Sequence, residues 1–263
     1  MKKTVKILLL AILVLALCLA VCGCAAKNTD ESADKQEPKA EETPKIETID
    51  SAKCKLERVD ESITDENGNV GVSWFFDKLV IEDSNPAAKI INADMEQKTS
   101  EFFSESKTQE ITEYYNNIYD SQCNQPFLNT AEGEVSYNSN GIISVSYVQD
   151  WFMGGVHNRN YDGFTYDLNT GGRLSLADLL SGSEAEVLTS VQNVYWDAIV
   201  EHYGATDTQE NARDYFEAKT LNDYKFFVGE NGEIHLIADT YEFAPGAAGA
   251  YVFASGLFVT KAG

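Results

Sequence analysis

Hydrophobic and polar positions along the chain change their period several times, and each change predicts a different element. The stretch 70–81 is apolar and aromatic with partial alternation, which is typical of a strand. From Pro86 the apolar residues recur at helical spacing, which predicts a helix with one buried face. That face carries Ala87, Ile91, Met95 and Phe102. A second helix over about 109–119 is expected to bury Ile111, Tyr114, Tyr115 and Ile118.

The pattern in the later part of the chain predicts hairpins, then helices and then strands again. Asn140-Gly141 is a turn signal between the strand patterns 134–137 and 142–152. Ser183 and Glu186 form a capping box that starts a helix with Val187, Val191, Val194, Tyr195 and Ala198 facing inward. The remaining expected elements are strands at 54–59, 161–168, 225–228, 234–241 and 251–260, and a helix at 208–218. This order predicts an α+β fold of two intimate subdomains, each of mainly antiparallel strands with packed helices.

The amino terminus has the layout of a bacterial lipoprotein signal peptide. A basic head with Lys2, Lys3 and Lys6 precedes an uncharged run from 7 to 21. This run of about 15 residues is shorter than the roughly 20 that a membrane-spanning helix needs. The stretch 21–25 resembles a lipobox in which Gly23 precedes the cleavage site and Cys24 is acylated. We therefore expect a signal peptide over 1–23 and a lipid anchor on Cys24.

Composition separates a tether from the folded part. Residues 24–50 are rich in Lys, Glu, Thr and Pro, and they cannot bury enough apolar surface to offset the entropy of ordering. The whole chain has 20 Lys and Arg against 42 Asp and Glu, a net charge of −22. Such a charge disfavours nucleic acid and favours cationic partners. The sequence thus predicts a disordered acidic tether and an ectodomain in two parts, 51–137 and 138–263.

Two cysteines fall in the predicted ectodomain, Cys54 and Cys123. An even pair in an exported protein is consistent with a disulfide. Two buried free thiols are the alternative, and the sequence leaves both open.

Motifs of catalysis and metal binding are missing from the sequence. It contains no GxSxG, no Gly-rich phosphate loop, no paired CxxC and no HExxH. Asp65, Asn67 and Asn69 have the spacing of a calcium loop, but Val70 stands where that loop needs Gly, so a hairpin turn is expected. We predict no catalytic residues, no metal site and no cofactor.

Two loops combine aromatic side chains with Gly turns, a pattern that can anchor a sugar or a protein partner. The first loop contributes Trp151, Phe152, His157 and Asn158 as candidate binding residues. The second loop contributes Tyr241 and Glu242. The alternative is that Trp151 and Phe152 end a strand in the core while the Gly residues only bend the chain.

The same loops carry a resemblance to a known family. The segments GGVH (154–157), YDLNTGGRLSLADLL (166–180) and YEFAPGAAG (241–249) resemble the DUF3298 domain, with one extra Gly in the second segment. The part 51–137 resembles the DUF4163 domain that usually precedes it. The family includes the lysozyme-binding ectodomain of an anti-sigma factor and the N-terminal part of a peptidoglycan deacetylase. The resemblance implies a binding domain and supplies no catalytic residues.

The expected function is that of an extracytoplasmic lipoprotein with a non-catalytic binding ectodomain. The expected ligand is a cationic lysozyme-like protein or a cell-wall glycan, and acidity favours the protein because charge complementarity speeds association. A cell-wall-modifying enzyme with an unrecognised site around His157 and a purely structural interaction protein are the alternatives.

Overall fold

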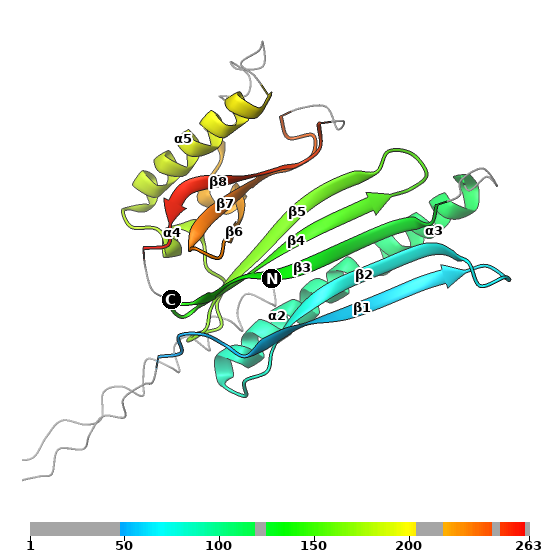
Figure 1. Ribbon diagram of the computed structural model, residues 1–263, viewed down its shortest axis with the longest axis horizontal. Coiled ribbons are helices and arrows are strands. Elements are labelled where there is room, and N and C mark those ends of the chain that lie inside the picture. The colour runs from blue at the N-terminus through cyan, green and yellow to red at the C-terminus, as the bar shows by residue number, and fades with distance from the viewer. Residues whose placement is uncertain (1–47, 119–124, 204–217, 244–247, 261–263) are drawn as a thin grey trace, which may run out of the picture. The chain divides into compact units, whose positions relative to one another are not determined.

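Residues 48–118, 125–203, 218–243 and 248–260 are described by a computed structural model, and they form two sheets with packed helices (Figure 1). The first sheet has the order β1 (Cys54–Thr64), β2 (Val70–Ile81), β3 (Phe127–Ser139), β4 (Ile142–Phe152), β5 (Asn158–Asp167). The second has the order β6 (Lys225–Val228), β7 (Glu233–Ala238), β8 (Tyr251–Phe258). The helices are α2 (Pro86–Phe102), α3 (Glu105–Ile118), α4 (Leu176–Leu179), α5 (Glu184–Tyr203) and the 3₁₀ turn η1 (Leu221–Asp223). The predicted α+β class is confirmed.

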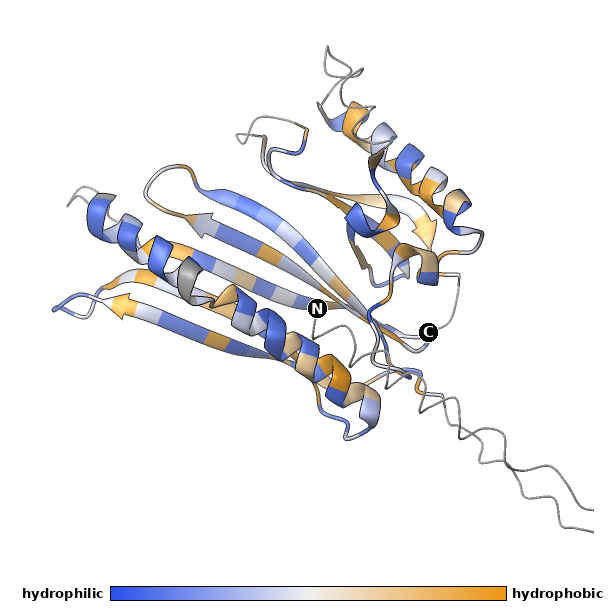
Figure 2. Ribbon diagram, turned by 180° about the vertical axis from the view of Figure 1, so that it is seen from behind, coloured by the Kyte–Doolittle hydropathy of each residue, from blue (hydrophilic) through white to orange (hydrophobic). Residues whose placement is uncertain are grey.

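Helices α2 and α3 cover one face of the first sheet, as Figure 2 shows from behind. Strands β2 and β3 pair in parallel, whereas the other neighbours in this sheet are antiparallel. A parallel pair needs a long crossover, and the two helices supply it. Asn85 Oδ1 accepts a hydrogen bond from Ala88 N at 2.8 Å and Pro86 occupies the first turn, so the helix begins where the sequence predicted.

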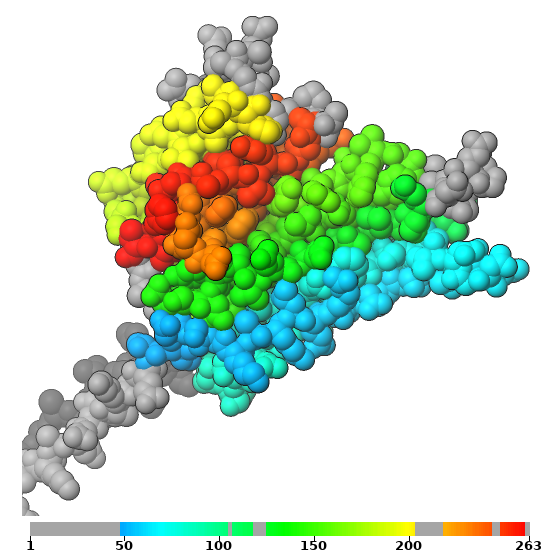
Figure 3. Space-filling model, viewed as in Figure 1, coloured from blue at the N-terminus to red at the C-terminus, as the bar shows by residue number. Residues whose placement is uncertain are grey.

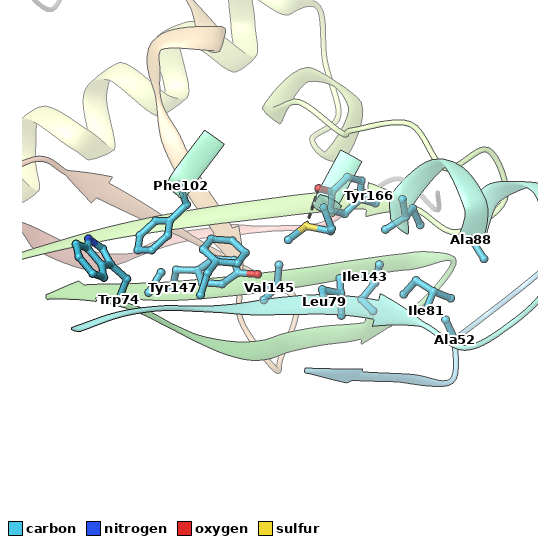
Figure 4. Packing of buried hydrophobic residues seen from close by; sticks show 14 of the residues in the cluster. Ala52, Trp74, Leu79, Ile81, Ala88, Phe102, Ile143, Val145, Tyr147 and Tyr166 are labelled. Carbon is cyan, nitrogen blue, oxygen red and sulfur yellow. Dashed lines mark hydrogen bonds between the residues drawn. The ribbon is translucent and has the colours of Figure 1, made fainter. Parts of the chain in front are cut away.

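The main core lies between these helices and the sheet, and Figure 4 shows part of it. All four residues expected on the inner face of α2 are buried. Burying a large apolar side chain contributes about 1.5–3 kcal/mol, so this layer dominates the stability of the first sheet. On α3 Ile111 is buried, but the prediction for Tyr114 is wrong because its side chain is 41% exposed. Tyr115, one turn after Ile111, packs edge-on against Phe127 instead, with ring centroids 5.6 Å apart.

A second core joins α4, α5 and the second sheet. Val187, Val191 and Tyr195 are buried as predicted, while Val194 and Ala198 are half-buried. The capping box at the start of α5 is confirmed: Ser183 N donates to Glu186 Oε2 at 2.8 Å and Glu186 N to Ser183 Oγ at 3.4 Å. Tyr137 and Ile142 of the first sheet belong to this core, so the β3–β4 hairpin links both sheets.

The two sheets meet where β6 crosses β5, and Figure 3 shows the second sheet (orange to red) seated against the green strands of the first. A Cβ built on Gly163 would lie 2.2 Å from the Phe226 carbonyl oxygen, so only glycine permits this approach. Val228 N donates to Ser144 Oγ at 3.0 Å, and that hydroxyl lies 2.9 Å from Thr165 Oγ1 in a buried pair. The crossing is therefore closely packed and its polar groups are satisfied.

Several sequence predictions concern segments away from these cores. Asp65 Oδ1 accepts from Asn67 N and Asn69 N, both at 2.8 Å, which confirms the hairpin turn. Ile49 N donates a hydrogen bond to Asn169 Oδ1 at 2.8 Å. The folded part therefore begins before residue 50, the boundary that composition suggested. Residues 1–47, Cys123 and most of the predicted helix 208–218 lie outside the described residues.

The turn after β5 explains much of the motif at 166–180. Asp167 accepts from Asn169 N at 2.7 Å and from Thr170 Oγ1 at 2.8 Å, and Gly171 has φ 80°. The turn folds the chain back so that Arg173 forms an isolated antiparallel β-bridge with Tyr166. In α4 the capping box of Ser175 and Asp178 follows, with Leu176 and Leu179 buried. The motif residues thus build the fold and place Arg173 beside β5.

Gly171→Ala should destabilise the protein by about 2 kcal/mol or more. A side chain at positive φ costs about 1–2 kcal/mol, and the new Cβ would lie 2.6 Å from the Ala87 carbonyl oxygen. Gly172→Ala is the matched control, because the nearest atom to its Cβ would be Thr170 Oγ1 at 3.4 Å. Denaturant unfolding of the two variants measures the difference, and equal stabilities would contradict this role of Gly171.

Candidate functional site

The first candidate loop divides its aromatic residues between the surface and the core. Trp151 is 36% exposed. Phe152 is half-buried, with ring centroids 6.0 Å from Phe127 and 6.2 Å from His157. The prediction that these residues end a strand in the core therefore holds for Phe152, whereas Trp151 is partly exposed.

His157 lies beside a carboxylate that another residue already holds. Arg159 donates to both oxygens of Asp150, at 2.9 and 3.2 Å, while His157 Nε2 is 3.7 Å from Asp150 Oδ1. That distance is too long for the hydrogen bond that orients a catalytic base. Asn158 Nδ2 donates to the Val156 carbonyl within the same loop at 3.2 Å. Among the described residues no group of three His, Cys, Asp or Glu could hold a metal ion.

Glu242 in the second loop has internal partners. Its carboxylate accepts from Lys219 Nζ, from the Tyr195 hydroxyl at 2.9 Å and from Asp239 N at 2.9 Å. The side chains of Glu242 and Lys219 are only about one-tenth exposed. Lys219 Nζ also lies 5.0 and 4.9 Å from the ring centroids of Tyr195 and Tyr224. Burial and the nearby Glu242 carboxylate raise the pKa of Tyr195, so its hydroxyl stays a donor.

The hydrogen bonds of the Glu242 carboxylate fix the turn that carries the neighbouring Tyr241. The residue has φ 71°, a conformation that non-glycine residues rarely adopt, and its side chain is 72% exposed. Glu242 N donates to the Asp239 carbonyl at 3.1 Å and closes the turn. Thr240 Oγ1 donates to the Arg159 carbonyl on β5 at 3.1 Å, which ties the second loop to the strand that follows the first. Strained backbone that presents an exposed aromatic ring is a feature of binding sites.

Three adjoining cavities form what we call the β5 groove. The central cavity, about 580 Å³, lies at the edge of β5 between α2 and the η1–β6 segment. The Trp151 cavity, about 400 Å³, shares Phe102, Lys107 and Gln149 with it. The Tyr241 cavity, about 510 Å³, shares Lys225 with it. Trp151 and Tyr241 therefore line separate cavities that flank the central one.

The Trp151 cavity is lined by side-chain amides as well as by the indole ring. These amides belong to Asn129, Gln149 and Asn160. Asn160 Oδ1 is buried and has no hydrogen-bond partner among the described residues. A buried acceptor without a donor is costly. Asn160 Oδ1 has almost no exposed surface, so a ligand hydroxyl or N–H would satisfy it only after the amide turned toward the cavity. Gln149 and Asn160 escaped the sequence analysis because β4 and β5 contain several other polar residues, so neither stands out in the sequence.

Cys54 is half-buried and has no disulfide partner among the described residues, and burial raises the pKa of its thiol. Its Sγ lies 3.8 Å from Asn138 Nδ2. Because Cys123 lies outside the described residues, a bond between the two cysteines stays a prediction.

Comparison with known proteins places the fold but no activity. The sequence matches no model of a known protein family, and no curated protein is detectably similar to it. A crystal structure of a DUF3298 family protein from Pseudomonas aeruginosa PAO1 is similar, with a TM-score of 0.50 and 13% identity. The match covers 78% of this chain and 91% of that one. A member of the same family from Bacteroides fragilis gives 0.46 and 12%, covering 79% and 91%. The chain therefore has a DUF3298-like fold.

No helix within the described residues combines the length and the apolar character that a membrane span requires.

Proposed function

We propose that this protein is a non-catalytic binding protein of the bacterial cell envelope, and that it holds a cell-wall glycan in the β5 groove. The observation that carries the proposal is the Trp151 cavity, which is lined both by the partly exposed Trp151 and by Asn160, whose buried Oδ1 has no partner among the described residues. Sugar rings stack on aromatic faces, and their hydroxyls satisfy amide acceptors. One cavity thus offers both contacts that a glycan needs.

The extent of the groove favours a polymer over a small molecule. Each flanking cavity shares lining residues with the central one, and an exposed aromatic residue lines each flanking cavity. Small-molecule sites are instead concave pockets that enclose most of their ligand. A chain of several sugars could contact the three cavities at once and gain from each.

Trp151→Ala and Tyr241→Ala should each weaken glycan binding about tenfold, because an aromatic stacking contact contributes about 1–2 kcal/mol. The measurement is a pull-down of the detergent-solubilised full chain on purified peptidoglycan over a range of protein concentrations.

Val156→Ala is the matched control. Val156 is 68% exposed in the same loop as Trp151 and lines none of the three cavities. Its binding should equal that of the unsubstituted protein. If both aromatic variants also bind as before, the groove is not the glycan site.

A cationic lysozyme-like protein is the second candidate ligand, and the net charge of −22 favours it. Opposite charge speeds association, and salt screens this attraction within about 10 Å at about 0.1 M. Lysozyme should then bind the full chain at low ionic strength and lose affinity steadily as salt rises. A titration by surface plasmon resonance measures this. Absence of binding at low salt would exclude this ligand.

We also propose that Cys24 carries the lipid that holds the protein outside the cell. The support is the basic head, the apolar run 7–21 and the small residue before Cys24. Two acyl chains suffice for stable anchoring. Cys24→Ser should abolish incorporation of labelled palmitate and release the protein from the membrane fraction, whereas Cys22→Ser should leave both largely intact. Palmitate labelling that survives Cys24→Ser would place the anchor elsewhere.

A further inference from the structure

Basic side chains gather in the central cavity of an otherwise acidic protein. Four separate parts of the chain supply them: Lys98 from α2, Lys107 from α3, Arg173 from the turn after β5 and Lys225 from β6. The acidic residues that line the same cavity are Glu101 and Asp162. The residues that line the cavity are thus four bases and two acids, in a chain whose net charge is −22. Asp94 and Asp239, which do not line the cavity, pair with Arg173 and Lys225.

The flanking cavities do not share this excess. The Trp151 cavity is lined by one base, Lys107, and by one acid, Glu110. In the Tyr241 cavity the bases Lys219 and Lys225 are outnumbered by acids, namely Asp223, Asp239 and Glu242. Positive charge is thus concentrated in the middle of the β5 groove.

Arg173 is held so that part of its guanidinium remains available. Its Nε donates to Asp94 Oδ2 at 2.9 Å, and its Cζ lies 4.4 Å from the centre of the Phe164 ring. The Tyr166 hydroxyl donates to the same Asp94 oxygen at 2.6 Å and steadies it. The Asp94 bond uses Nε alone, and the Tyr166 hydroxyl is a second side-chain partner of the guanidinium. A guanidinium has five N–H donors, so donors remain for an oxyanion oxygen.

The three lysines of the central cavity differ in whether an acidic side chain pairs with them. Lys98 pairs with Glu101 at 2.6 Å and Lys225 with Asp239 at 2.7 Å. Lys107 has no ion pair among the described residues and is exposed at the boundary between the central and Trp151 cavities. An anionic ligand would give this charge a partner without displacing an internal one.

Asp162 is the acidic residue on the β5 side of the cavity wall. Its carboxylate accepts from Gly163 N at 2.8 Å. Burial raises the pKa of the Asp162 carboxyl, although the bond from Gly163 N and the charge of Lys225 act in the opposite direction.

We propose that the ligand of the β5 groove is an acidic glycan whose oxyanion, a carboxylate or a phosphate, lies in the central cavity against Arg173 and Lys107. This inference rests on the glycan-binding function proposed above and adds the charge that the ligand carries. A neutral sugar next to the acidic one would then occupy the Trp151 cavity, where the bases and acids balance.

The test compares three ligands of similar length on the detergent-solubilised full chain by isothermal titration calorimetry. One is a neutral N-acetylglucosamine oligomer, the second is a peptide-free wall glycan fragment in which alternate sugars carry a lactyl carboxylate, and the third is a glycerol phosphate polymer. The carboxylate or the phosphate ligand should bind at least tenfold tighter than the neutral oligomer. Whichever of the two binds tighter identifies the oxyanion.

Lys107→Met should remove most of that preference, because it should lower the affinity for the acidic ligands far more than the affinity for the neutral oligomer. This substitution leaves no acidic partner unpaired, so loss of folding is not expected. Lys89→Met is the control, because Lys89 is an exposed base of α2 that lines none of the three cavities.

The outcomes separate the two proposals. Equal affinity for neutral and acidic glycans would overturn the inference and leave glycan binding standing. Failure of all three ligands to bind would remove the proposed function and the inference with it. A charge preference that survives Lys107→Met would overturn the placement of the anion.

Discussion

The contact between two backbones at Gly163 is the constraint on which the arrangement of the molecule depends. Strand β6 passes so close to β5 that the Phe226 carbonyl occupies the space of a side chain. The Ser144 hydroxyl accepts from the Val228 amide at the same crossing, so this buried donor is paired. Strand β6 contacts β4 as well as β5, and residues of η1 and β6 line the central cavity together with residues of β5.

The turn that follows β5 completes that wall from the other direction. Asp167 organises the turn through its own side chain, and Gly171 lets it pack against the start of α2. The turn returns the chain to β5 and delivers Arg173 to the groove. Residues that appeared in the sequence as a family motif thus form a structural unit, and three of them, Arg173, Leu174 and Ser175, line the central cavity.

Local patterns predicted the elements well, because local forces determine them. The strand 70–81, the start of α2 at Pro86 and the capping box at Ser183 follow from alternation, proline geometry and capping. The prediction that Tyr114 is buried was wrong, because the spacing of aromatic residues alone does not show which of them faces the core. The parallel pairing of β2 with β3 has no local signal, since residues far apart in the chain decide it. Trp151 and Tyr241 were recognisable, whereas the bases of the central cavity come from four separate elements that only the fold brings together.

The anchored turn at Glu242 has a consequence for how Tyr241 would act. An unfavourable backbone conformation is normally adopted only when a partner compensates for it. Here the buried pair with Lys219 supplies that compensation during folding, before any ligand arrives. The phenol ring is therefore preorganised, and a glycan that stacks on it would lose little of its binding free energy to ordering the loop.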